Sequence, residues 1–183
     1  MIRNNNSILK IFRKISAIYL ITVISFTLLC GIFPVKYSPI INRFSLEYGV
    51  DKDLVFALIK AESNFSESAV SHASAKGLMQ LTDATFLHCM QILDFKGGAP
   101  DIFNTAQNLQ AGIWYLSFLT DKYDGNISNA VAAYNAGFSN VDKWLKDTEF
   151  STDGRSLTKI PFPETARHVR KIIMYKKIYS LLY

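Results

Sequence analysis

Cysteine and charged residues are scarce in this sequence. Two of its 183 residues are cysteine, and 19% are charged. Cys30 falls in an apolar N-terminal run and Cys89 lies far outside it, so no disulfide is available within a folded domain. The net charge of +5 suits an anionic wall polymer or membrane headgroups, and it fits an ordinary solvated surface equally well. Dense Lys/Arg clusters with interleaved aromatic residues are lacking, which argues against nucleic-acid binding.

Signatures of metal and nucleotide sites are also missing. The spacing of His72, His88 and His168, taken with Cys89, matches no recognised zinc pattern. The pair Gly97-Gly98 lacks the Gly-Lys-Ser/Thr of a phosphate-binding loop. We therefore expect no metal and no other cofactor.

A long apolar run stands near the N-terminus. Residues 17–35 carry no charge and approach the ~20 residues needed to cross a bilayer. Lys10, Arg13 and Lys14 precede the run, with Arg3 further out, and basic residues stay on the cytoplasmic side. We expect a cytoplasmic segment at 1–16, a transmembrane signal anchor at 17–35 and an extracytoplasmic domain at 36–183, periplasmic or facing the wall. The alternative is a cleavable signal peptide, although the run exceeds the usual ~7–15 apolar residues and no small-x-small site follows it.

Periodic apolar residues predict a mainly α-helical domain after this run. Asp51 or Asp53 is available as an N-cap, Thr82 or Asp83 opens a later helix, and Gly137 is suited to follow a helix C-terminus. No convincing alternation of the kind that predicts strands is present. The expected helices cover residues 39–47, 53–63, 82–93, 105–123, 128–136 and 164–181.

Glu62 is unusual in this pattern. It shares one side of its helix with an apolar stripe formed by Leu54, Val55, Leu58 and Ile59. Desolvation and the nearby helix C-terminus both favour the protonated carboxyl, which is the form a general acid needs. From the helix alone, a buried structural glutamate, or one that points outward at a frayed helix end, stays open as an interpretation.

Four ordered motifs resolve this ambiguity. Glu62-Ser63 is followed by Gly77-Leu78-Met79-Gln80, by Ala133-Tyr134-Asn135-Ala136-Gly137, and by Phe162-Pro163-Glu164-Thr165 before the last helix. Together they resemble the lysozyme-like catalytic domain of soluble lytic transglycosylases, over most of the chain outside the apolar run. The joint occurrence of four motifs is far more specific than any one of them.

The resemblance implies an enzyme that cleaves the β-1,4 bond between MurNAc and GlcNAc in peptidoglycan. In this family a single glutamate, here Glu62, protonates the glycosidic oxygen and then accepts the proton of the sugar's own C6 hydroxyl. The product is a 1,6-anhydromuramoyl end, and no water is consumed. This accounts for the lack of a second carboxylate motif, which glycosidases that use water generally need.

The resemblance also implies a set of substrate contacts. Ser71 and Gln80 match positions that orient substrate, Met79 is expected to pack against the sugars, and Tyr134 is expected in the cleft near Glu62. Asn135 is expected either to bind substrate or to stabilise its turn. Core packing is the alternative for Met79 and Tyr134.

His168 departs from the family pattern, because the matching position usually holds a tyrosine close to the catalytic glutamate. A histidine also donates a hydrogen bond, but a charged histidine would favour the ionised glutamate. Two alternatives to a lytic transglycosylase stay open. One is a hydrolytic muramidase on the same scaffold. The other, which His168 keeps open, is a catalytically idle peptidoglycan-binding scaffold of an envelope assembly.

Overall fold

The computed structural model describes the backbone of residues 2–183 and the side chains of residues 9, 10 and 12–183. It confirms a mainly α-helical chain: in the described part there is no strand, and Lys76 forms isolated antiparallel bridges with Val70 and Leu81. The helices in chain order are α1 (Ile2–Ile32), α2 (Ser38–Tyr48), α3 (Lys52–Glu62), α4 (Asp83–Ile92), α5 (Thr105–Lys122), α6 (Ile127–Ala136), α7 (Phe138–Leu145) and α8 (Pro163–Leu182).

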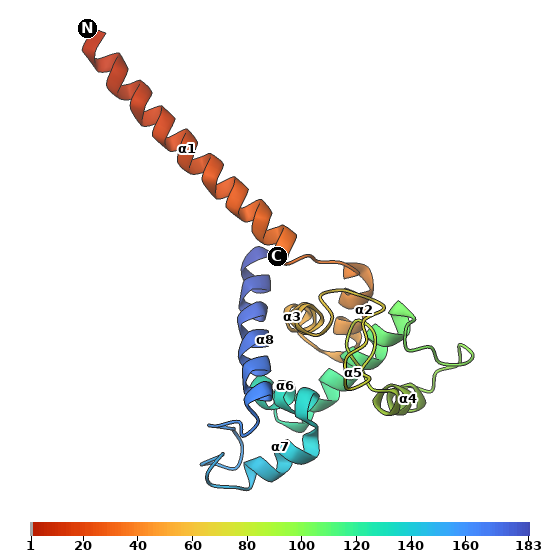
Figure 1. The fold of residues 1–183 in the computed structure, drawn as a ribbon. Helices are drawn as coiled ribbons and strands as arrows, with labels where there is room; N and C mark the ends of the chain where they lie inside the picture. Colours follow the sequence, from red (N-terminus) through yellow and green to blue (C-terminus); the bar gives the residue numbers. More distant parts are fainter. Residues whose placement is uncertain (1) are drawn as a thin grey trace. The chain divides into compact units, whose positions relative to one another are not determined.

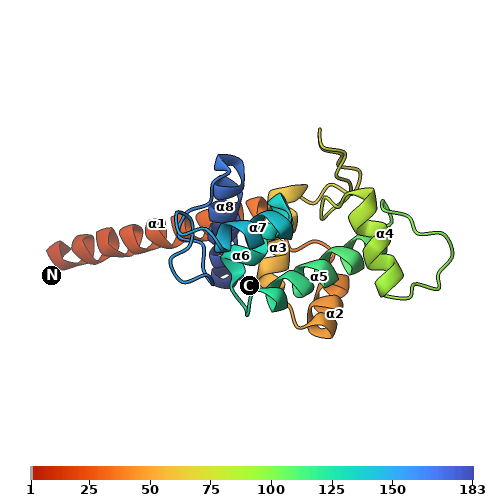
Figure 2. The same cartoon turned by 90° about the horizontal axis from the view of Figure 1, so that it is seen from below.

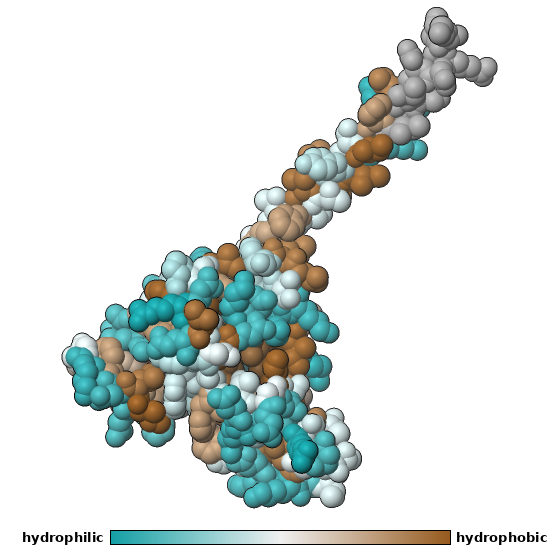
Figure 3. Space-filling model, turned by 180° about the vertical axis from the view of Figure 1, so that it is seen from behind, coloured by the Kyte–Doolittle hydropathy of each residue, from teal (hydrophilic) through white to brown (hydrophobic). Residues whose placement is uncertain are grey.

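The α1 helix, with the residues after it to Pro34, is a unit of its own. Its stretch Phe12–Ile32 has 21 residues with a mean hydropathy of 2.2, and none of it is buried within the structure. Figure 3 shows hydrophobic side chains along this helix. By length and composition the stretch qualifies as a membrane span, and a signal sequence near the N-terminus passes the same test. The side chain of Arg3, one of the four expected cytoplasmic basic residues, lies outside the described residues.

The helix ends earlier than the apolar run suggested. It stops at Ile32, whereas the run continues to Val35. Pro34 explains the difference, because proline donates no backbone hydrogen bond and disfavours helical backbone in the residue before it.

The second unit, Val35–Leu181, is built around α3. Six consecutive residues of α3, from Leu54 to Ile59, are buried. A helix that is apolar on all sides is one enclosed by its neighbours. Figures 1 and 2 show α8 at one side of this unit, α4 at the opposite side, and α3 and α5 between them. Because α3 is held in the core and ends at the surface, its last residue, Glu62, lies at the surface on a firmly packed helix.

Helix caps agree with the sequence. Asp51 caps α3 by accepting a hydrogen bond from Asp53 N, Thr82 caps α4, and Gly137 ends α6 with a φ of 84°.

The α7 helix was not expected. Of its eight residues only Val141 and Trp144 are buried, so its apolar period is too short to stand out in the sequence.

Candidate functional site

Glu62 lies where two hollows of the surface meet. The larger has a volume of about 900 Å³ and extends past His72 and Tyr134 to Thr165 at the start of α8. The smaller has a volume of about 440 Å³ and lies between the end of α3 and the α8 residues Lys171 and Tyr175. Glu62, Ser71 and Gln80 line both hollows, so they mark the centre of one continuous cleft.

His168 of α8 lies against Glu62. Its Nε2 lies 3.1 Å from Glu62 Oε1, and the two side chains are only 13% and 15% exposed. The Nε2 atom is buried, and its contact with Glu62 does not have hydrogen-bond geometry. The imidazole nitrogen and the carboxyl oxygen therefore lie at contact distance from each other inside the site.

Gln80 and Ser71 belong to a tight loop that forms one wall of the cleft. Gln80 has a left-handed backbone with a φ of 48°, and its side-chain amide donates hydrogen bonds to Gly77 O at 2.9 Å and Ala69 O at 3.1 Å. Ser71 Oγ accepts a hydrogen bond from Ala75 N at 3.1 Å. These bonds close the loop on itself and hold both polar side chains at the cleft.

Ser63 and Asn108 fasten this loop to the helices beneath it. Ser63 Oγ donates to Leu78 O at 2.7 Å. Asn108, buried on α5, accepts from Met79 N at 2.9 Å and donates to Ile102 O at 2.9 Å. A polar residue among the apolar positions of α5 was a sequence signal for such a role, and sequence reasoning missed it.

Met79 differs from its expectation. Its side chain is fully buried and therefore does not contact the cleft in this structure. The reason is Gly112 of α5, where even a Cβ atom would come within 2.4 Å of Met79 Sδ. Because Gly112 has no side chain, α5 leaves room for the Met79 thioether in the core.

Tyr134 reaches the site from the last turn of α6. Its hydroxyl donates to Met79 O at 2.8 Å, and its ring packs 5.5 Å from that of Tyr115. Burial, followed by the charge of Glu62, raises the pKa of Tyr134 well above its usual range. Tyr134 is therefore a permanent hydrogen-bond donor that fixes the loop below Glu62.

Asn135 lines the larger hollow and connects α6 to α8. Its Oδ1 accepts a hydrogen bond from Thr165 Oγ1 at 2.6 Å, and Thr165 is buried. The third and fourth motifs of the sequence are thus joined directly. This bond fixes the orientation of the Asn135 amide in the cleft.

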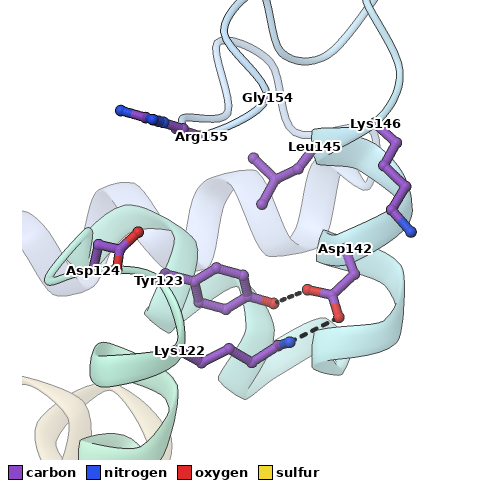
Figure 4. Close-up of a pocket in the computed structure, with 8 residues that line it drawn as sticks. All are labelled: Lys122, Tyr123, Asp124, Asp142, Leu145, Lys146, Gly154 and Arg155. Carbon is purple, nitrogen blue, oxygen red and sulfur yellow. Dashed lines mark hydrogen bonds and ion pairs between the residues drawn. The ribbon is translucent and has the colours of Figure 1, made fainter.

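A third pocket, of about 290 Å³, lies away from these motifs near the ends of α5 and α7 (Figure 4). Asp142 accepts a hydrogen bond from Tyr123 at 2.9 Å and pairs with Lys122 at 2.9 Å. Burial, and then the hydrogen bond to Asp142, raise the pKa of Tyr123. Both carboxylate oxygens of Asp142 are engaged in holding α5 to α7, so Asp142 has a structural role here.

A known protein-family model matches the part of the chain that contains most of the residues of this cleft. The family model described as "Transglycosylase SLT domain" matches residues 39–155. This range contains Glu62 and the first three motifs and ends before the fourth.

Two curated relatives of this chain share one name and come from different organisms. Membrane-bound lytic murein transglycosylase C of Photorhabdus laumondii is 34% identical over 135 residues, which cover 68% of this chain and 36% of the relative. The protein of that name from Yersinia enterocolitica is 35% identical over 116 residues, covering 58% of this chain and 32% of the relative. The chain thus spans about a third of the length of these relatives.

Two solved structures have a fold similar to that of this chain. The lytic transglycosylase Slt of Pseudomonas aeruginosa, solved as an inactive mutant, matches 81% of this chain and 24% of its own, with a TM-score of 0.72 and 30% identity. The 70 kDa soluble lytic transglycosylase of Escherichia coli matches 84% of this chain and 25% of its own, with a TM-score of 0.74 and 24% identity. The fold is the lysozyme-like one expected from the motifs, and the chain belongs to the transglycosylase SLT domain family.

Proposed function

We propose that this chain is a peptidoglycan lytic transglycosylase that cleaves the β-1,4 bond between MurNAc and GlcNAc. The observation that carries the proposal is the position of Glu62, a carboxyl that lines both of the hollows that form the cleft. A polymer chain can lie through such a cleft with one of its internal bonds beside the carboxyl. The relatives named as lytic murein transglycosylases support the same substrate.

In the proposed mechanism Glu62 is first acid and then base. The protonated carboxyl gives its proton to the glycosidic oxygen as the bond breaks. The resulting carboxylate takes the proton of the C6 hydroxyl, whose oxygen attacks the anomeric carbon and forms the 1,6-anhydro ring. His168, 3.1 Å from Glu62, stabilises the carboxylate between the two steps.

The surrounding polar residues hold the sugar in place for this reaction. Ser71, Gln80 and Asn135 line the cleft and are each fixed by hydrogen bonds to neighbouring atoms. Side chains that are already ordered lose little freedom when a sugar binds. They are the proposed substrate contacts, and Tyr134 supports them from below.

We also propose that the catalytic unit works outside the cytoplasm, attached to the cell membrane by α1. The apolar stretch Phe12–Ile32 and the basic residues at its start support this placement. The curated relatives are named as membrane-bound proteins.

A hydrolytic muramidase is the second candidate, because Glu164 also lines the larger hollow. A second carboxylate in the cleft is what activation of water would require. Glu164 is exposed at the start of α8.

The test uses the full chain in detergent micelles and measures the release of soluble fragments from purified wall sacculi. Glu62→Gln is expected to lower the rate by at least ~10²-fold, because the general acid is lost. Glu164→Gln is expected to keep the rate within about threefold, well short of the ~10²–10⁴-fold that a catalytic acid or base supplies. Glu149→Gln, which removes an exposed carboxylate paired with Lys159, is the matched control.

A comparable loss in Glu164→Gln would favour the hydrolase. No release by the wild type, with folding verified and sacculi still bound, would favour a wall-binding scaffold.

A further inference from the structure

Two lysines line the smaller hollow beside Glu62. Lys60 lies two residues before Glu62 in the last turn of α3, and Lys171 comes from α8. Both face a volume of about 440 Å³ that is continuous with the larger hollow through Glu62, Ser71 and Gln80. Both ammonium groups thus belong to the smaller of the two hollows that Glu62 lines.

The structure holds both ammonium groups in position. Lys171 Nζ donates to Ala61 O at 3.3 Å and lies 5.6 Å from the ring centroid of Tyr175. Lys60 Nζ donates to Asn64 Oδ1 at 2.5 Å. An ammonium group has three N–H donors, so Lys171 can bind a ligand without giving up its bond to α3.

The two charges act on each other. Burial, and then the charge of Lys171, lower the pKa of Lys60. Two like charges at one wall repel, and an anion bound between them would be attracted to both. The hollow is therefore better suited to a carboxylate than to a neutral sugar.

Only one part of the proposed substrate supplies that chemistry. GlcNAc is neutral, and the negative charge of a glycan strand resides on the lactyl group of MurNAc or on the peptide attached to it. Resting on the proposed function, we infer that Lys60 and Lys171 form a specificity site for a carboxylate of the muramoyl branch. The site selects the sugar that carries the branch and thereby places the bond next to it at Glu62.

The test measures binding with the full chain in detergent micelles, separately from bond cleavage. Lys60→Gln and Lys171→Gln are compared with Lys177→Gln, which removes an exposed charge from the same helix outside both hollows. Three ligands are used: glycan strands with peptides, strands stripped of peptides by an amidase, and neutral GlcNAc oligomers.

Each variant in the hollow is expected to bind peptide-bearing strands about three- to fivefold more weakly, at the upper end of what a partly exposed ion pair contributes. The expected loss for neutral oligomers, and for Lys177→Gln on any ligand, is under about twofold. A loss that disappears on stripped strands assigns the peptide carboxylates. A loss that appears only on stripped strands assigns the lactyl carboxylate, because in peptide-bearing strands that group is an amide. Losses on both kinds of strand show that the site accepts either carboxylate.

An equal loss on neutral oligomers, or no loss on any ligand, would overturn the inference. Failure of the proposed function looks different: the wild type would then release no anhydro-ended fragments, whatever the lysines contribute to binding.

Discussion

At the scale of single residues, the site depends on how Glu62 is surrounded. The carboxyl is mostly buried at the end of a core helix, with the His168 ring 3.1 Å away and Tyr134 fixed below it. The sequence predicted Glu62, Gln80 and Tyr134 as neighbours because their motifs are recognisable. It could not predict that Met79 is buried, because that depends on the space which Gly112 leaves on a different helix.

The contact between His168 and Glu62 leads to the first prediction. His168→Phe keeps a ring of similar size but removes the nitrogen that faces Glu62. We expect kcat to fall about tenfold, equivalent to ~1.4 kcal/mol of transition-state stabilisation, with KM changed less than twofold. His168→Tyr, which supplies a hydroxyl donor, is expected to recover most of the rate. Steady-state kinetics on soluble glycan strands provide the measurement, and an unchanged kcat in His168→Phe would show that the contact has no catalytic role.

At the scale of elements, the loop that carries Gln80 is shaped by its packing against α5. Gly77 has a φ of 76°, and a Cβ atom there would lie 2.3 Å from Asn108 Nδ2. The loop therefore depends on a glycine for two reasons, backbone conformation and close approach to another helix.

Gly77→Ala is expected to destabilise the fold by about 3 kcal/mol, of which ~1–2 kcal/mol is left-handed backbone strain and the rest overpacking. Gly49→Ala is the matched control, because Gly49 has a similar φ of 68° but open space around it. Urea unfolding of both variants separates the two effects. Equal losses would mean that contact with Asn108 contributes nothing.

The clamp between α3 and α8 gives a prediction about pH. Asp51 caps α3 and pairs with Lys176 at 2.6 Å. Burial alone would raise the pKa of Asp51, but hydrogen bonds from Lys176 and Asp53 N outweigh it and lower the pKa. A lowered pKa in the folded state adds stability above the unfolded value, about 3.9, and that stability is lost as the pH falls through the folded value.

Asp51→Asn keeps a side-chain cap and removes the charge. We expect it to be less stable than the wild type at pH 7 and nearly equal to it at an acidic pH below the folded pKa of Asp51, where the wild-type carboxyl is protonated. Unfolding by urea at both pH values is the measurement. Asp94→Asn, at an exposed loop position, is the control and is expected to change stability by less than ~0.5 kcal/mol. A gap between wild type and Asp51→Asn that is the same at both pH values would contradict the assignment.

Helix positions were predictable to within one or two residues where a cap and a long apolar period coincide, as for α3 and α5. The position of α7 was not predictable, because this helix buries only two residues. The place of Lys171 beside Glu62 was not predictable either, because it depends on the packing of α8 against α3. Local sequence signals therefore predict the helices. The residues that tertiary packing brings to the cleft can be identified only from the structure.

At the scale of the whole molecule, the chain combines a lysozyme-like unit with a helix that is apolar enough to cross a membrane. If α1 is a retained anchor, the chain stays in the membrane pellet after an alkaline carbonate wash, with its full mass. Ile24→Lys combined with Phe26→Lys is expected to release it, because each lysine near the centre of a span costs ~2.5–3.5 kcal/mol. Leu46→Lys, at an 87% exposed position of α2, is the control. A product shortened by the length of α1 would show a cleaved signal sequence instead.

The most direct test of the account is the chemistry of the fragments released from sacculi in water enriched in oxygen-18, read by mass spectrometry. The account predicts 1,6-anhydromuramoyl ends without the heavy isotope from the wild type, and no such ends from Glu62→Gln. Reducing muramic acid ends that carry oxygen-18 would contradict it, because they would show that water, rather than the sugar's own C6 hydroxyl, attacks the bond.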